Sequence, residues 1–298
     1  MSGTAASTAR GEPRKLRTTK SAVRRHRAGR MLTYSFLAAV ALIYLFPFLI
    51  AIATSFKTEP NATANPLGLA PSPPTTSAFH QLYQDQDFLL WVKNSPIVTL
   101  SVTFLRVFLD SLAGYALARL RFRGRGAAFA TIVAVMAVPG VVLLIPKFLM
   151  IRQLGIYNTY YGMIIPLLVD AAGVFIMKNF FESIPTSVEE SARIDGAGIF
   201  RIYWSIVLPM ARPALITIFI LAFQGSWNEL AHFIISAQST SLNTLTKGVA
   251  QLASGQLGSG NRYPLKLAAS TLMTIPVAVL FFVFQRRIMN VASGAVKE

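Results

Sequence analysis

The sequence has no cysteine and few charged side chains. Its 298 residues include three histidines and 12 acidic residues, and charged residues make up only 13% of the chain. The lack of cysteine excludes disulfides and thiolate metal ligands, and the scattered histidines form no metal-binding pattern. The chain also has no glycine-rich loop ending in Lys and Ser or Thr, the pattern that holds the phosphates of ATP. We therefore expect no catalytic residue, no metal site and no nucleotide bound by this chain.

Hydrophobic residues dominate instead, at 53% of the chain, and the mean hydropathy is +0.52. A soluble domain of this length is rarely so apolar. A helix needs roughly 20 residues to cross the hydrocarbon core of a bilayer, and the backbone of such a segment must satisfy its own hydrogen bonds. The sequence therefore predicts an all-α, polytopic membrane protein with six transmembrane helices, at about residues 31–56, 96–118, 127–148, 160–181, 213–235 and 265–284.

Positive charges are placed unevenly along this chain, whose net charge is +16. Residues 1–30 hold nine Lys or Arg and one acid, Glu12, and read as a disordered basic tail before a membrane domain at 31–298. Because loops rich in Lys and Arg stay in the cytoplasm, we expect both termini inside and no nucleic-acid partner. Two further clusters agree with this topology: Arg119, Arg121, Arg123 and Arg125 after the second run, and Arg286 and Arg287 after the last.

A short amphipathic segment, residues 185–212, separates the fourth and fifth apolar runs. Pro185 is suited to the start of a helix, and Thr186 or Ser187 is suited to cap it. We expect this helix to end near Asp195, because Gly196 and Gly198 permit backbone angles that other residues resist. Seven positions here follow a spaced pattern: Glu190, Ser191, Ala192, Gly196, Ile206, Leu208 and Pro209.

That pattern resembles the EAA loop of ABC importer permeases, with Ser191 where the family most often has Ala. The flanking words extend the likeness to the second permease subunit of maltose-type carbohydrate importers, from about Tyr34 to the end of the chain. These words are FFESIP at 180–185, ARIDGA at 192–197, LPMARPAL at 208–215, GSWNE at 225–229, AGYALARLRFRGRG at 113–126 and SGAVK at 293–297.

The resemblance implies a transport subunit rather than an enzyme. Its EAA-type coupling helix, with Asp195 among the docking residues, would dock on a cytoplasmic ABC ATPase that uses ATP and Mg. It further implies a second homologous permease, two copies of the ATPase, a solute-binding protein outside, and a prokaryotic plasma membrane as the location. The expected solute is a disaccharide, an oligosaccharide or a sugar derivative.

Charged and polar residues inside the predicted helices are candidates for the translocation pathway. Arg106 and Asp110 lie one turn apart, and each alone would cost about 2.5 to 3.5 kcal/mol near the bilayer centre. They are expected either to line a polar cavity or partner surface, or to neutralise each other. Asp170 has no partner at helical spacing in its own segment. The fifth run supplies hydrogen-bonding groups and a ring suited to a sugar: Gln224, Trp227, Asn228 and Glu229.

Two alternatives remain open from the residues. One is an ABC permease for another small polar solute, such as an amino acid or phosphate. The other is an ion-coupled secondary transporter, with Arg106, Asp110, Asp170 and Glu229 as the relay. A membrane enzyme would need a nucleophile, metal or carboxylate pair that the sequence does not offer. We expect the connection at 236–264 to lie outside, where it would contact a solute-binding protein or serve only as a link.

Overall fold

The structure is a computed structural model that describes residues 20–85, 87–256 and 262–294, without the side chains of 20–29, 85 and 286–294. The chain forms two units, Met1–Ile50 and Ala51–Glu298. The described part of the first unit belongs to α1 (Lys20–Ser55). This helix starts ten residues before the predicted end of the basic tail, and residues 1–19 of that tail lie outside the described residues. The predictions at Arg286, Arg287 and 293–297 rest on side chains that are likewise not described.

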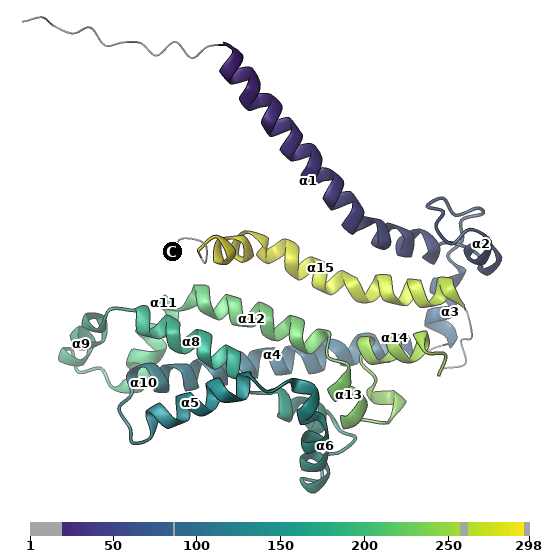
Figure 1. Cartoon of the computed structure of the whole chain (residues 1–298). Coiled ribbons are helices and arrows are strands. Elements are labelled where there is room, and N and C mark those ends of the chain that lie inside the picture. The colour runs from purple at the N-terminus through teal and green to yellow at the C-terminus, as the bar shows by residue number, and fades with distance from the viewer. Residues whose placement is uncertain (1–19, 86, 257–261, 295–298) are drawn as a thin grey trace, which may run out of the picture. The chain divides into compact units, whose positions relative to one another are not determined.

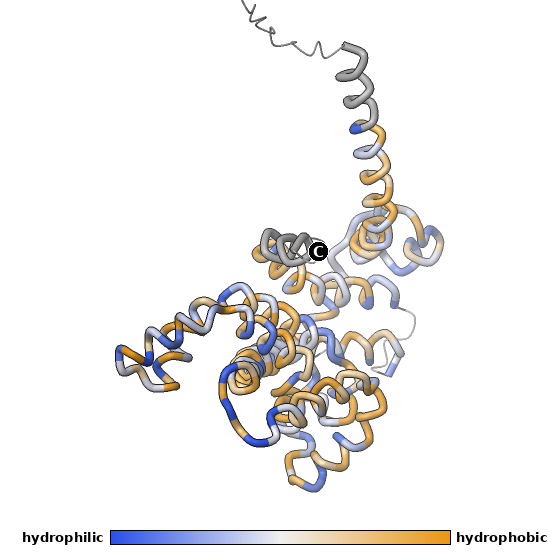
Figure 2. The backbone as a smooth tube through the Cα atoms, turned by 60° about the vertical axis from the view of Figure 1, so that its left-hand side comes forward, coloured by the Kyte–Doolittle hydropathy of each residue, from blue (hydrophilic) through white to orange (hydrophobic). Residues whose placement is uncertain are grey.

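The second unit is helical throughout its described part, which has no β-strand. In Figure 1 the helices are labelled and coloured along the chain from purple to yellow. Figure 2 shows hydrophobic residues along most of them and hydrophilic residues in several connections. The α-helices are α2 (Glu59–Ala64), α3 (Ser77–Asp85), α4 (Phe88–Arg119), α5 (Arg125–Met136), α6 (Leu144–Gln153), α7 (Tyr160–Ile164), α8 (Ala171–Ser183), α9 (Thr186–Ile194), α10 (Ile199–Ile202), α11 (Leu208–Met210), α12 (Arg212–Trp227), α13 (Ala231–Ser236), α14 (Leu245–Ala253) and α15 (Tyr263–Gly294). Four short turns join them: the 3-10 turns η1 (Gly140–Leu143), η2 (Ile165–Leu167) and η4 (Thr240–Leu242), and the π-turn η3 (Tyr203–Val207).

Three helical stretches are long and apolar enough to cross a bilayer alone, namely Arg30–Ser55, Phe88–Arg119 and Tyr263–Gln285. Three further candidates are bent helix pairs, so the described residues provide up to six spans. The pairs are Arg125–Met136 with Gly140–Gln153, bent by 103°, Tyr160–Leu167 with Ala171–Ser183, bent by 42°, and Ile199–Met210 with Arg212–Trp227, bent by 80°.

Three of the predicted spans are therefore wrong as continuous helices. The run at 160–181 is interrupted between η2 and α8, with a bend of 42°. The run at 127–148 breaks before η1, where Pro139 occupies the N-cap position and does not continue α5. The run at 213–235 ends at Trp227, and a separate short helix, α13, begins at Ala231. The hydrophobic composition of these segments predicted that they lie in the membrane. It did not predict the bends, because straight and bent segments can be equally apolar.

Helix α4 is the central element of the second unit, and it lies beside both α8 and α12 (Figure 1). Gly114 allows a close approach of α4 to α8, because a Cβ atom there would lie 2.6 Å from the Cβ of Met177 and 2.9 Å from the backbone nitrogen of Lys178. Small residues at helix contacts of membrane proteins bring backbones together in this way. One hydrophobic core cluster that α4 and α8 share includes Tyr115, Phe181 and Tyr203.

The two ends of α4 meet different parts of the chain. Trp91, near its start, is buried against α14, and a Cβ atom at Gly248 would lie 2.3 Å from the indole ring. Arg119, its last residue, contacts α9. A 32-residue helix is about 48 Å long, so α9 and α14 lie on opposite sides of any membrane that α4 crosses. Helix α14 also replaces part of the simple connection that we expected at 236–264.

Gly114→Ala tests the close approach of α4 and α8. The added methyl group has no space beside Met177 and Lys178, so the two helices must separate, and we expect a loss of about 1 to 3 kcal/mol of stability. Thermal unfolding of the detergent-purified protein measures this loss. Gly126→Ala is the matched control, because no heavy atom lies within 4 Å of a Cβ there. Equal midpoints for the two variants would contradict the packing argument.

Candidate functional site

The segment from α9 to α10 is a helix, a tight turn and a second short helix. Helix α9 matches the helix that the sequence predicts between Pro185 and Asp195. Its C-terminus is closed by two backbone bonds, from Gly196 N to Arg193 O (3.0 Å) and from Ala197 N to Ala192 O (2.9 Å). This arrangement requires a left-handed residue at position 196, where φ is +80°. Gly196 therefore sets the direction in which the chain leaves α9.

The start of α9 differs from the prediction. Pro185 occupies the N-cap position, and no side chain caps the helix. Neither Thr186 nor Ser187 has the expected capping role, because both lie inside the first turn. Gly198 also has no conformational need for glycine, since its φ is −74°. Of the two glycines expected to end the helix, only Gly196 does so through its backbone angles.

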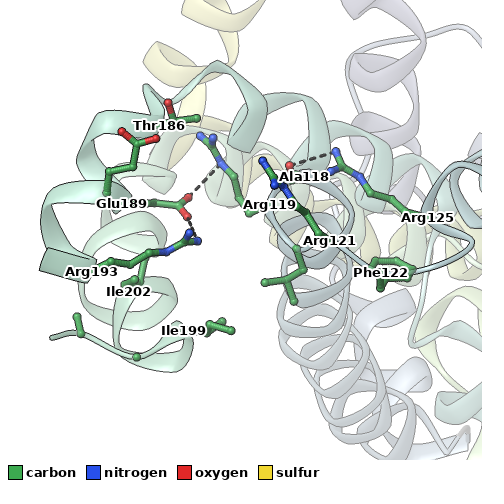
Figure 3. Close-up of a pocket in the computed structure, with 14 residues that line it drawn as sticks. Ala118, Arg119, Arg121, Phe122, Arg125, Thr186, Glu189, Arg193, Ile199 and Ile202 are labelled. Atoms are coloured by element: carbon green, nitrogen blue, oxygen red, sulfur yellow. Dashed lines mark hydrogen bonds and ion pairs between the residues drawn. The ribbon is translucent and has the colours of Figure 1, made fainter.

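A buried ion pair attaches α9 to the rest of the protein. Glu189 is 4% exposed, and its carboxylate lies 3.1 Å from Nε of Arg119 and 3.6 Å from Nη2 of Arg193. Arg119 also donates hydrogen bonds to the carbonyl oxygens of Phe181 and Ile184, at the end of α8. One guanidinium thus joins the end of α4, the end of α8 and the middle of α9, as Figure 3 shows for its contact with Glu189.

The residues of the spaced pattern divide between two faces. Ala192 is buried with Ile202 and Val207 in the core, and Ile206 and Leu208 pack against the same cluster. The hydroxyl groups of Tyr203 and Ser111 lie 2.7 Å apart and fasten this face to α4. The other pattern residues are exposed, together with the candidate Asp195: Glu190, Ser191, Gly196 and Pro209.

The outer face of the segment is an unusual mixture of apolar and charged groups. Ile194 is 86% exposed and Phe200 is 84% exposed, and Trp204 is 60% exposed. Beside them lies a hollow of about 870 Å³ between the end of α4 and the helices α9 and α10 (Figure 3). Four arginines line it: Arg119, Arg121, Arg125 and Arg193. Exposed apolar groups rimmed by charges are typical of a surface that binds another protein. We call this face, with Ile194, Phe200, Trp204 and the adjacent hollow, the α9–α10 surface.

The candidate pathway carboxylates all accept hydrogen bonds from backbone nitrogens at interruptions of helices. Asp110 accepts from Asp170 N (3.0 Å), Asp170 accepts from Gly173 N (3.1 Å), and Glu229 accepts from His232 N (2.9 Å). Asp170 is the N-cap of α8, and an Asp three residues before the bonded nitrogen is a common capping signal. These three groups hold helix ends in place, a role that the sequence analysis did not assign to them.

Arg106 and Asp110 do not form a direct ion pair in the part of the chain that the structure describes, although their charges interact over a longer distance. Nε of Arg106 instead donates to the carbonyl oxygen of Leu167 in η2 (2.7 Å). The structure brings Arg106, Asp110 and Asp170 together around the break between η2 and α8.

The remaining candidates lie along and after α12 in different surroundings. Trp227 is 5% exposed in an apolar cluster, and its ring nitrogen donates to Met273 O (3.2 Å). Gln224 is half-buried and Asn228 is exposed. Trp227 therefore packs in a different environment from the group of Arg106, Asp110 and Asp170.

Comparison with known proteins identifies relatives of this fold. Residues 111–290 match the family described as "Binding-protein-dependent transport system inner membrane component". The sulfoquinovosyl glycerol transport system permease protein SmoH of Agrobacterium fabrum is 34% identical over 88% of this chain and 93% of its own length. The arabinooligosaccharides transport system permease protein AraQ of Halalkalibacterium halodurans is 31% identical over 90% of this chain and 96% of its own length.

The fold also occurs in a solved structure. A chain from a bacterial ABC transporter involved in the import of the acidic polysaccharide alginate is 27% identical, with a TM-score of 0.76. The match covers 88% of this chain and 97% of that chain. The long helices and the bent pairs described above are thus the architecture of a transport protein's membrane subunit.

Glu189→Gln tests the attachment of α9. The substitution leaves the Arg119 guanidinium buried without its carboxylate, and breaking such a pair costs about 3 kcal/mol. We expect amide hydrogen exchange in α9 to become roughly a hundredfold faster. The control is Glu182→Gln, which removes a partly exposed carboxylate paired with Lys178 and Arg125 and has little effect on exchange. Similar exchange in both variants would show that the buried pair does not hold α9.

Proposed function

Because this chain belongs to the family of binding-protein-dependent transport system inner membrane components, we propose that it forms half of the membrane pathway of an ATP-driven carbohydrate importer. The chain is a transport component and not an enzyme. The family match covers more than half of its residues, and two relatives above 30% identity have names that state a sugar-based solute. The solute that these relatives support is a disaccharide, an oligosaccharide or a sugar derivative.

The α9–α10 surface is the proposed docking site for a cytoplasmic ABC ATPase. The observation that carries this proposal is the combination of exposed Ile194 and Phe200 with a buried attachment at Glu189. The exposed side chains provide apolar contact area for a partner, and the ion pair to Arg119 carries a displacement of α9 to the ends of α4 and α8. Glu189 and Glu190 also line the hollow beside it, but Arg121 in that lining forms no ion pair with a described residue and suits an acidic group of the partner.

The complete importer would contain four further polypeptides. A second homologous permease completes the pathway, two copies of the ATPase bind and hydrolyse ATP with Mg, and a solute-binding protein delivers the sugar from outside. This chain itself supplies no cofactor site in the proposal. Lipid surrounds the assembly in a prokaryotic plasma membrane.

The orientation proposed from the charges fits the arrangement of the helices. The arginine-rich connection between α4 and α5 lies beside α9, because Arg119 contacts Glu189 and Arg121 and Arg125 line the same hollow. Placing these arginines in the cytoplasm also places α9 there. Helix α14, at the other end of α4, then lies on the outer side, where a solute-binding protein docks. The same topology puts both termini of the chain in the cytoplasm.

Transport follows from a shift between two arrangements of the complex. ATP-bound closure of the two ATPases favours one arrangement of the permeases, and ATP hydrolysis restores the other. In this proposal the ATPase contacts this chain at the α9–α10 surface, so its closure acts on the membrane helices through that surface.

Reconstitution in liposomes tests the proposed function. The complex contains both permeases, the two ATPases and the solute-binding protein. It is expected to transport a radiolabelled sugar only when ATP is present on the side of the membrane that carries the ATPases. Omission of the solute-binding protein is expected to abolish uptake. Uptake by this chain alone, driven by an ion gradient, would contradict the proposal and support a secondary transporter.

Gly196→Asp tests the docking role of the turn. The substitution puts a charge and a strained backbone conformation at the end of α9, which costs roughly 1 to 3 kcal/mol. We expect uptake to fall roughly tenfold or more while ATP hydrolysis continues, so that hydrolysis and transport become uncoupled. Gly155→Asp is the matched control, since its φ is +67° and no heavy atom lies within 4 Å, yet it is far from α9 in the chain. Normal uptake by Gly196→Asp at normal membrane abundance would count against docking.

A further inference from the structure

Arg106 lies where three elements of the second unit meet. It is in the middle of α4, its Nε donates to Leu167 O in η2 (2.7 Å), and its Nη1 lies 3.7 Å from the position of a Cβ atom at Gly225 in α12. Since Gly225 has no side chain, nothing from that position of α12 covers the guanidinium. The hydrogen bond at Nε fixes the plane of the group, and no hydrogen bond to a described residue uses its two terminal nitrogens.

This guanidinium has no carboxylate in salt-bridge contact within the described part of the chain, although the charge of Asp110 is near enough to interact with it. Asp110, one turn along α4, uses its carboxylate for the backbone of Asp170. No carboxylate oxygen of a described residue lies within 4.0 Å of Arg106, and no described acceptor is bonded to its terminal nitrogens. A positive charge at this depth is costly in lipid, and such residues usually face a partner group or a wet cavity.

An exposed face of α12 passes the guanidinium at Gly225. Leu221 and Gly225 lie one turn apart on this face, Asn228 follows as the C-cap of α12, and all three are exposed. Val169, beside the η2 break, is 60% exposed. Arg106 is half-buried at the edge of this face, so a group that moves along it reaches the terminal nitrogens. A guanidinium presents paired N–H donors that match the two oxygens of a carboxylate.

We propose that Arg106 is a binding residue for an anionic group, a carboxylate or a chemically similar oxyanion, on the transported sugar. The inference rests on the proposed function, because it assumes that a carbohydrate passes this face. It adds that the solute is an acidic carbohydrate, and that charge recognition occurs within the membrane part of this chain. An acidic residue of the second permease is the competing partner for the same nitrogens.

The experiment uses the complete importer in detergent or liposomes. Two probes are compared, a disaccharide that ends in glucuronic acid and the corresponding disaccharide that ends in glucose. Binding to the complex without the solute-binding protein is measured by saturation-transfer NMR, and uptake is measured with that protein present at saturating sugar. Three variants are compared with the native chain: Arg106→Gln removes the charge, Arg106→Lys keeps it, and Arg152→Gln removes an exposed cation on α6 that lies over the ring of Tyr157.

The native complex is expected to bind the acidic disaccharide roughly tenfold or more tightly than the neutral one. Arg106→Gln is expected to abolish this preference, so that the ratio of the affinities for the acidic and the neutral disaccharide falls roughly tenfold. Arg106→Lys is expected to keep part of the preference, and Arg152→Gln to keep all of it.

Three results overturn the proposal. The first is equal binding of the two probes, or binding of neither, by the native complex. The second is that Arg106→Gln weakens the binding of both disaccharides equally, which is the result expected if the guanidinium pairs with the second permease. The third is an unchanged preference in Arg106→Gln. The proposed function fails differently, because it fails if no sugar is imported in an ATP-dependent way. If the complex with Arg106→Gln does not assemble, the native complex and Arg106→Lys are compared instead. The proposal then fails if Arg106→Lys prefers the acidic disaccharide as strongly as the native complex does.

Discussion

The buried contact between Arg119 and Glu189 determines how the proposed docking segment relates to the membrane helices. Arg119 is the last residue of α4, and the same guanidinium also binds two carbonyl oxygens at the end of α8. An unpaired charge at this depth would be strongly unfavourable. Helices α4, α8 and α9 are therefore held together at one point, where the Arg119 guanidinium binds the Glu189 carboxylate and the two carbonyl oxygens. The close approach of α4 and α8 at Gly114 adds a second, apolar constraint on the same two helices.

The interior of the membrane part follows a related rule. Helices here are interrupted, and each interruption exposes backbone nitrogens that lipid cannot satisfy. Asp110, Asp170 and Glu229 each supply an acceptor at such a break. Charged residues that resemble a proton relay in the sequence thus serve as caps in the structure. Arg106 differs from them, because only one of its nitrogens donates a hydrogen bond to a residue that the structure describes.

The sequence predicted the helical class, most of the apolar segments and the position of α9. These features depend on composition and local signals, such as Pro185 and Gly196, which act over a few residues. The bend of 103° after α5 and the early end of α12 were not predictable from hydrophobicity, because straight and bent segments are equally apolar. The pattern singled out Glu190, but the buried carboxylate is Glu189. Only the contact with Arg119, 70 positions away, distinguishes the two adjacent acids. An N-cap at Asp170 was readable from its spacing to Gly173.

The left-handed turn after α9 has a consequence for stereochemistry. Gly196 has a φ of +80°, and no heavy atom lies within 4 Å of the position that its Cβ would occupy. The requirement at this position is therefore one of handedness and not of volume. A D-amino acid, introduced by chemical ligation, would satisfy the backbone as well as glycine does and would add a side chain at the tip of the turn. A φ of +80° favours the mirror-image residue over its L counterpart, so this corner offers a site for a reporter group next to the outer face of α9.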